Sequence, residues 1–339
     1  MAASLGDTVL EVFVGDPRSS EFVDHARYGK ALNVDPFEPH EFTDQDDAAA
    51  ANWQQVAGRK LTKMCRAGIP EYFRGGVWSK VMSPTMDEAG TPSHKLQQER
   101  IWTRVLEKVF EGDGMGEEVP GYGAELRLED HCLSAEGRAA ARRLLVTIKH
   151  MLAVDWSPSL LDIVPLLLIY MPESCVYGVV EEMWGMKPLF FPHNEGEFES
   201  WAATFSNMVK DFFPETSKEM AKCGADSPQH LSQILIRMFV PILVRLKHLV
   251  VVWDAWFCEG SKVIFRYGLA LLKMYKKRLK ALKLKAGQGE RGPKAGGIFS
   301  RAFFFLPTCR RVFKPRPKSA SPRGAAGNST QERPRLKKG

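Results

Sequence analysis

The sequence lacks a long apolar run and a hydrophobic leader. Its longest apolar stretch, Leu160–Met171, has 12 residues and contains Asp162 and Pro165, whereas a membrane-spanning helix needs about 18–20 apolar residues. Residues Met1–Asp7 contain neither the basic group nor the apolar run of a secretory signal peptide. We therefore expect no membrane-spanning helix and a cytoplasmic location.

Cysteine is scarce and scattered. The chain has 6 cysteines in 339 residues, and neighbouring ones are at least 35 residues apart. The sequence contains no Cys-x-x-Cys pair and no Cys/His ligand cluster, which argues against a disulfide framework and against structural zinc. We predict a reducing compartment, no metal site and no cofactor.

Acidic residues are almost absent from the C-terminal part. From Lys273 to the last residue there are 20 basic and 2 acidic residues, a net charge of +18. Residues 1–272 hold 27 basic and 38 acidic residues, a net charge of −11. This asymmetry predicts an anionic partner for the C-terminal part, either a membrane surface or a nucleic acid.

Alternating strand patterns are also missing, and the apolar spacing is helical. Phe198–Phe212 and Arg138–Leu152 both repeat apolar residues three and four positions apart, which predicts one buried helix face each. We therefore predict an all-α fold with three parts: a loosely ordered acidic arm over residues 1–52, a multi-helix domain over residues 53–285, and a disordered basic tail over residues 286–339.

Several segments resemble one family. Gly68–Trp78 looks like the opening signature of TBC domains, the helical Rab GTPase-activating fold, and Trp253–Gly260 resembles a later one. Cys132–Gly137 and Ser157–Tyr170 are similar to the Skywalker-type TBC–TLDc branch. The tail is too short for a TLDc domain, so either a TBC-only relative or a shortened gene remains open. The aromatic residues of the two signatures are expected in the core: Trp78, Trp253, Trp256 and Phe257.

The resemblance implies a Rab/Arf-type small GTPase as partner and a role in vesicle trafficking. It places the motif aspartate at Asp130, which leaves Leu133 where a catalytic arginine is expected and Pro158 where a glutamine is expected. Neither side chain supplies charge or an amide, so the resemblance predicts an adaptor without GTPase-activating residues. The alternative is an active GTPase-activating protein that uses Arg127 or Arg138 instead.

Basic positions match a second family feature. The resemblance implies a phosphoinositide headgroup pocket at Arg66, Lys262 and Arg266, with Arg74 as a rival for the first position. At 100° per residue, five cations fall within a sector of about 60° on one predicted helix. They are Lys262, Arg266, Lys273, Lys277 and Lys280. A solvated helix face explains such a stripe equally well.

The tail combines cations with aromatics in Ile298–Leu306, a pattern typical of peripheral membrane anchoring. The predicted membrane contacts are Lys273, Lys277, Lys280, Phe303, Phe304, Phe305, Arg310 and Arg311. Bases also stack on phenylalanine, so nucleic acid remains a disfavoured alternative partner. The expected location is cytoplasmic, at the periphery of a membrane or on vesicles.

Overall fold

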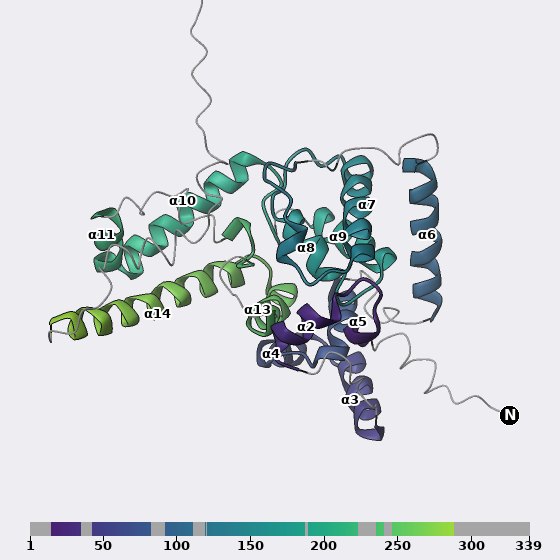
Figure 1. Ribbon diagram of the computed structural model, residues 1–339, viewed down its shortest axis with the longest axis horizontal. Coiled ribbons are helices and arrows are strands. Elements are labelled where there is room, and N and C mark those ends of the chain that lie inside the picture. Colours follow the sequence, from purple (N-terminus) through teal and green to yellow (C-terminus); the bar gives the residue numbers. More distant parts are fainter. Residues whose placement is uncertain are drawn as a thin grey trace, which may run out of the picture. The chain divides into compact units, whose positions relative to one another are not determined.

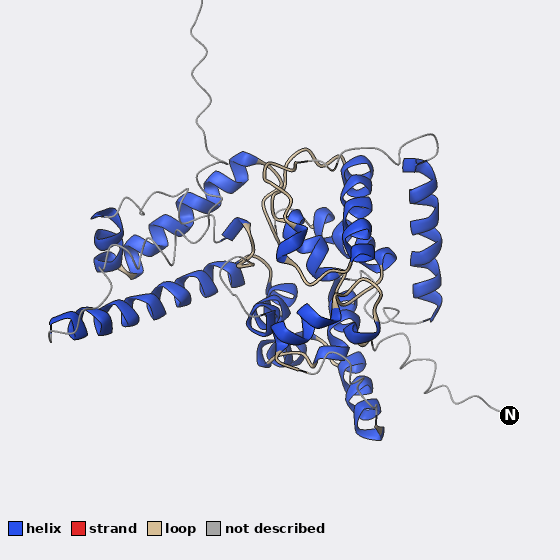
Figure 2. Cartoon of the chain, viewed as in Figure 1, coloured by secondary structure: helices blue, strands red, loops and turns tan. Residues whose placement is uncertain are grey.

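The computed structural model describes residues 15–34, 43–82, 92–110, 119, 121–186, 189–222, 235–240 and 246–287. Over these residues the chain forms helices and turns, and its sole extended pairing is an antiparallel bridge between Val23 and Leu133 (Figures 1 and 2). The predicted all-α fold is confirmed.

The α-helices run in chain order through the described part of the chain (Figure 1). They are α2 (His25–Leu32), α3 (Asp44–Gln55), α4 (Gly58–Ala67), α5 (Arg74–Met82), α6 (Pro92–Phe110), α7 (Ala135–Leu152), α8 (Leu160–Leu167), α9 (Glu173–Gly185), α10 (Glu195–Phe212), α11 (Pro214–Lys222), α13 (Leu246–Glu259) and α14 (Lys262–Gly287). Short 3₁₀ helices are η1 (Pro17–Ser19), η2 (Glu71–Phe73) and η4 (Leu128–Asp130).

Helices α7 and α10 confirm the two predicted amphipathic segments, and side chains cap both. The Ser134 hydroxyl accepts a hydrogen bond from Gly137 N at 3.0 Å at the start of α7. At the start of α10, Asn194 Oδ1 accepts from Glu197 N at 2.9 Å. These bonds satisfy amide groups that a helix start otherwise leaves unpaired.

The core gathers around α13. Trp78 of α5 stacks on Phe257 of α13 with ring centroids 4.7 Å apart, and Trp253 meets Trp256 edge to face at 5.2 Å. All four side chains are buried, as the sequence predicts. Burial of such large rings dominates core energetics, so these signature residues hold α5 against α13.

The described residues within 1–52 differ from the predicted loosely ordered arm. Residues 15–34 place Val23 and Tyr28 in the core, and α3 begins with a capping box in which Asp46 Oδ2 accepts from Thr43 N at 2.9 Å. The acidic run Asp44–Asp47 lies in the first turn of α3, where the helix dipole favours negative charge. The acidic residues that suggested disorder therefore begin a helix.

Candidate functional site

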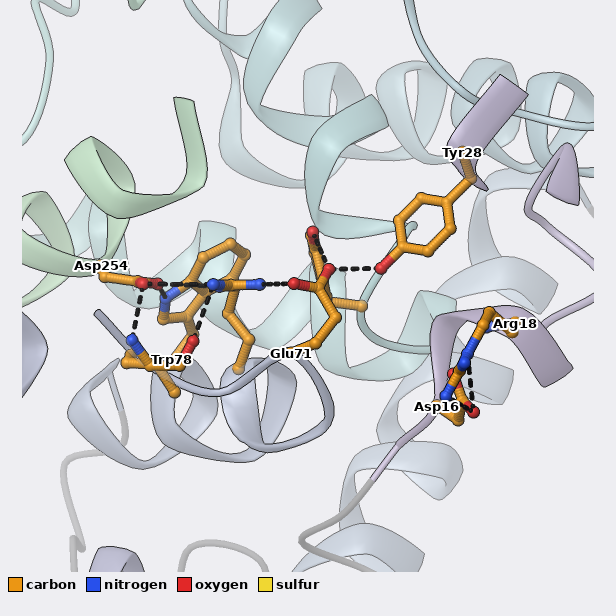
Figure 3. A network of polar contacts seen from close by, with 9 residues as sticks. Asp16, Arg18, Tyr28, Glu71, Trp78 and Asp254 are labelled. Atoms are coloured by element: carbon orange, nitrogen blue, oxygen red, sulfur yellow. Dashed lines mark hydrogen bonds and ion pairs between the residues drawn. The ribbon is translucent and has the colours of Figure 1, made fainter. Parts of the chain in front are cut away.

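A buried ionic network joins the two signatures that carry the family resemblance. Arg74 Nε lies 3.1 Å from Asp254 Oδ1, and both side chains are buried. Figure 3 shows Asp254, Trp78, Glu71 and Tyr28 within this network. Asp254 also accepts hydrogen bonds from Trp78 Nε1 at 3.0 Å and from Ile69 N at 2.9 Å. The carboxylate thus fixes the start of α5 against the middle of α13.

Glu71 extends this network toward the N-terminal segment. Its carboxylate accepts from Arg74 Nη1, from the Tyr28 hydroxyl, and from the Tyr170 hydroxyl at 2.7 Å. Burial alone would lower the pKa of Arg74, but the acidic groups around it outweigh burial and raise that pKa. Because protein groups hold all three nitrogens of its guanidinium, Arg74 braces the fold and is not available to an external ligand.

The position expected to hold a catalytic arginine lies inside the protein. Leu133 has no exposed surface. The backbone on either side of it pairs with the N-terminal segment: Asp24 N donates to Cys132 O at 3.0 Å, and Ser134 N donates to Phe22 O at 2.9 Å. Residues 20–24 thus cover the loop that the resemblance makes catalytic.

The position expected to hold a glutamine, Pro158, is also buried. It precedes α8, whose Asp162 is fully buried and accepts from Arg237 Nη2 at 2.8 Å. His131 Nε2, from the loop before Leu133, lies 3.3 Å from Asp162 Oδ1. Burial raises the pKa of Asp162, but the hydrogen bonds from Arg237 and the close approach of His131 outweigh burial and hold it below its ordinary value. The structure therefore joins the two finger segments through a buried ionic cluster.

The two arginines proposed as substitutes already have local partners. Arg138 Nη1 donates to Leu133 O at 2.8 Å, and Arg127 Nη2 pairs with Glu125 Oε2 at 3.2 Å. Both side chains are partly exposed. Arg138 braces the loop that carries Leu133, so its geometry fits a structural role.

The three predicted headgroup residues lie at the junction of α4, α13 and α14. Arg66 of α4 binds Glu259 of α13 in bidentate fashion, with Nε to Oε1 at 2.6 Å and Nη2 to Oε2 at 2.7 Å. Arg266 Nη1 of α14 donates to Glu259 Oε2 at 2.9 Å. We name Arg66, Glu259, Lys262 and Arg266 the junction cluster; Lys262 is exposed at the first position of α14.

The carboxylate of the junction cluster is buried while its partners face outward. The Glu259 side chain is 5% exposed, whereas those of Arg66 and Arg266 are 56% and 59% exposed. The hydrogen bond from Arg66 is the main reason that the pKa of Glu259 lies below its ordinary value; Arg266 adds to this effect, and burial opposes it. Glu259 therefore stays ionised at neutral pH and orients both guanidinium groups.

The turn between Glu259 and Lys262 is closely held. Gly260 has φ +71°, and a Cβ there would lie 2.7 Å from Leu189 O. Ser261 N donates to the same carbonyl at 2.7 Å. Glycine is required here both for the left-handed backbone and for the close approach, so α14 starts from a fixed point.

The remaining predicted membrane residues are only partly described. Lys273 is exposed on α14, in line with the predicted stripe; α14 also carries Lys277 and Lys280, but their side chains lie outside the described part of the structure. The predicted tail contacts lie outside the described residues altogether: Phe303, Phe304, Phe305, Arg310 and Arg311.

The sequence analysis did not predict Glu259 as a member of this site, although Glu259 lies within the signature Trp253–Gly260. It also passed over Arg59, Lys60 and Lys63, which are exposed on α4 with Arg66. The available signal was the spacing of Arg59, Lys63 and Arg66, which puts three cations on one helix face. No sequence signal pairs Arg66 with a residue 193 positions away.

The described residues contain neither a cluster of metal ligands nor a membrane-spanning helix. Across the residues that the structure describes, His, Cys, Asp and Glu side chains nowhere gather in threes as a metal site would require. The helices of the same residues include none with the length and apolarity to cross a bilayer.

Comparison with known proteins defines the class. The family model of the Rab-GTPase-TBC domain matches residues 134–280. The crystal structure of the TBC domain of Skywalker/TBC1D24 from Drosophila melanogaster shares the fold, with a TM-score of 0.52 and 18% identity over 81% of this chain and 92% of that one. The protein therefore shares the helical fold of a TBC domain.

Relatives found by sequence point to the same class of domain. The human Ecotropic viral integration site 5 protein homolog is 25% identical over 261 residues, which is 69% of this chain and 28% of that protein. TBC1 domain family member 24 of Xenopus tropicalis is 26% identical over 164 residues, which is 47% of this chain and 29% of that protein. The chain thus spans less than a third of these relatives. Over residues 134–280 the chain is similar to the Rab-GTPase-TBC domain family.

Proposed function

We propose that this TBC-domain protein regulates a Rab/Arf-type small GTPase in vesicle trafficking as a binding adaptor without GTPase-activating residues. The single observation that carries the proposal is Leu133, an apolar and fully buried residue at the expected arginine position. An arginine finger supplied in trans stabilises the charge of the transition state and contributes about 10³–10⁵-fold to GTP hydrolysis. Leucine supplies no such charge.

The second finger position supports the same conclusion. A glutamine at Pro158 would orient the attacking water through its amide, but proline has no side-chain donor or acceptor. Pro158 is buried one turn before Asp162, whose ion pairs hold this segment in place. Transition-state stabilisation needs close placement, so a nearby group cannot readily take over.

Single-turnover GTP hydrolysis tests this proposal. A panel of GTP-loaded Rab proteins is mixed with excess full-length protein, and a TBC domain with both finger residues serves as positive control. We expect binding to one or more Rab proteins and acceleration well below the arginine-finger scale. Acceleration of about 10³-fold or more that is lost in Arg138→Ala or Arg127→Ala would overturn the proposal in favour of an active enzyme with unconventional residues.

The junction cluster supports a second part of the proposal, binding of phosphoinositide headgroups at an anionic membrane. Arg66 of α4 and Arg266 of α14 meet at Glu259, and Lys262 lies one turn before Arg266 on α14. Lys262 is also in the first turn of α14, where exposed amides and the helix dipole favour an anion. Guanidinium groups recognise phosphate by geometry as well as by charge. We place the protein in the cytoplasm, at the periphery of membranes or vesicles.

Vesicle binding tests the headgroup site. Lys262→Glu with Arg266→Glu should abolish the preference for phosphoinositide over phosphatidylserine vesicles of equal surface charge. The matched control is Arg142→Glu with Lys149→Glu, which makes the same charge change at two exposed positions of α7. An unchanged preference in the first variant, or an equal loss in the control, would assign the cations to an ordinary solvated face.

The basic tail is proposed to add unselective attraction. Polybasic segments gain about 1 kcal/mol per Lys or Arg near an anionic surface, and salt weakens this attraction. Deleting residues 288–339 should therefore lower total binding and its salt dependence while it leaves lipid preference intact. Oligonucleotides that displace the full-length protein from vesicles at equal charge concentration would instead favour nucleic acid as partner of the tail.

A further inference from the structure

The junction cluster contains its own anion. One carboxylate, Glu259, uses both oxygens: Oε1 accepts from Arg66 Nε, and Oε2 accepts from Arg66 Nη2 and from Arg266 Nη1. Among the residues that the structure describes, neither guanidinium has a second acidic partner. The site that would receive a phosphate therefore already holds a competing negative charge at its base.

The charges of the junction cluster set a threshold for any ligand. Arg66, Lys262 and Arg266 carry three positive charges, and Glu259 carries one negative charge that offsets one of them. A headgroup with one negative charge offers the arginines no more than Glu259 already supplies. A phosphate monoester carries about −1.5 to −2 at neutral pH, so one monoester already exceeds the charge of the carboxylate and a bisphosphate exceeds it greatly.

The geometry lets such a ligand bind without displacing Glu259. The carboxylate is 5% exposed and takes the inner edges of the two guanidinium groups, which are themselves more than half exposed. An arginine has five N–H donors in a rigid fork. Arg66 uses two nitrogens and Arg266 uses one toward Glu259, and this leaves Arg66 Nη1 and Arg266 Nε and Nη2 for a ligand.

We infer that Glu259 is the specificity-determining positioning residue of this site. It orients Arg66 and Arg266 for a ligand that carries phosphate monoesters, most strongly a bisphosphate, and disfavours singly charged headgroups. This inference rests on the proposed headgroup site. The residue acts through the two arginines and does not touch the ligand itself. A ligand binds more tightly to donors that are already oriented, because binding then does not have to order those side chains.

Glu259→Gln tests this role because it removes the charge and keeps the shape. The probes are phosphatidylcholine vesicles that contain either phosphatidylserine or phosphatidylinositol 4,5-bisphosphate at equal surface charge. The wild-type protein should prefer the bisphosphate. In the variant, binding to phosphatidylserine should rise and the preference should fall about tenfold, the scale of one charge-assisted hydrogen bond.

A matched control is available on the same molecule. Glu173 binds Arg143 Nη2 at 2.6 Å in a half-buried ion pair between α7 and α9. Glu173→Gln makes the same chemical change outside the junction cluster and should leave lipid preference unchanged. A fall of the preference in the control as large as in Glu259→Gln would overturn the inference, because it would reflect total charge alone.

Glu259→Asp provides a second variant in case Glu259→Gln does not fold, as judged by its circular dichroism. Aspartate keeps the charge but shortens the reach to both arginines. Phosphatidylserine binding should then stay low while bisphosphate binding weakens. Bisphosphate binding at the wild-type level in either folded variant, with phosphatidylserine binding unchanged, would overturn the inference.

Soluble inositol 1,4-bisphosphate and inorganic phosphate, measured by calorimetry, separate the two sources of ligand. Both the lipid headgroup and a free polyphosphate have the required chemistry; tighter binding to vesicles than to the soluble bisphosphate identifies the lipid. Failure of the inference is distinguishable from failure of the site. If Lys262→Glu with Arg266→Glu loses the preference and Glu259→Gln keeps it, the site stands and the role of Glu259 falls.

Discussion

Val23 and Leu133 pair in an antiparallel bridge, and both side chains are buried. The pairing joins a segment near the N-terminus to the loop in which the resemblance places the expected arginine position. An arginine introduced at this position would meet the core and the backbone of residues 20–24 before it could reach a bound GTPase. At the proposed finger position, the fold around residue 133 therefore leaves no room for an exposed arginine side chain.

Leu133→Arg should destabilise the protein without creating GTPase-activating activity. Burial of an unpaired charge is among the largest effects of single substitutions, and we expect a loss of about 3–5 kcal/mol in the free energy of unfolding. Urea unfolding and single-turnover hydrolysis measure the two outcomes. Leu133→Met, of similar volume, should cost less than about 1.5 kcal/mol. A stable Leu133→Arg variant that accelerates hydrolysis would show that the loop opens.

Gly137→Ala should detach the N-terminal segment from α7. A Cβ at Gly137 would lie 2.1 Å from Phe22 O, a backbone atom that cannot move without its segment. We expect faster hydrogen exchange at the amides of Asp24 and Ser134, whose bonds join the two segments. The control is Gly185→Ala, where nothing lies within 4 Å, and where alanine should be neutral or stabilise by about 0.5–1 kcal/mol. Equal exchange in both variants would contradict the close approach.

Asp254→Ala should cost at least about 3–5 kcal/mol of unfolding free energy, because it removes one partner of a buried ion pair. Arg74 would lose a counterion, and the donors Trp78 Nε1 and Ile69 N would lose their acceptor. The half-exposed pair of Arg143 and Glu173 offers a comparison, and Arg143→Met should cost no more than about 1 kcal/mol. Chemical denaturation measures the loss of unfolding free energy in each variant, and the loss should be larger for Asp254→Ala than for Arg143→Met.

Asp162 should make the stability depend on pH at the acidic end. In an unfolded chain an aspartate has a pKa of about 3.9. In the folded protein the hydrogen bonds from Arg237 and the close approach of His131 hold the pKa of Asp162 lower, although burial opposes them. The carboxylate therefore stabilises the fold fully above about pH 4, and this contribution is lost as the pH falls through the folded value.

Asp162→Asn isolates this contribution. At pH 7 the variant should be less stable than the wild type, and the difference between them should shrink as the pH is lowered below about 4. Urea unfolding at a series of pH values measures the difference. A constant difference from pH 7 to pH 3 would mean that Asp162 stabilises by shape and hydrogen bonding alone.

Local patterns in the sequence determined much of this protein. The apolar spacing and caps of α7 and α10 appear in the sequence because a helix relates residues three and four apart. The same geometry places Lys262 and Arg266 on one face of α14. The short residue signatures indicated the TBC-domain fold, since their aromatics fill the core that defines it.

Tertiary structure alone decided the rest, because these contacts join segments far apart in the chain. It placed Arg66 beside Glu259 and buried Arg74, although the two arginines lie eight residues apart and look alike in sequence. It also folded the segment around Val23 over Leu133, where acidic composition suggested a loose arm. Periodicity reports which face of a helix is buried, whereas the identity of the neighbour depends on how all the helices pack together.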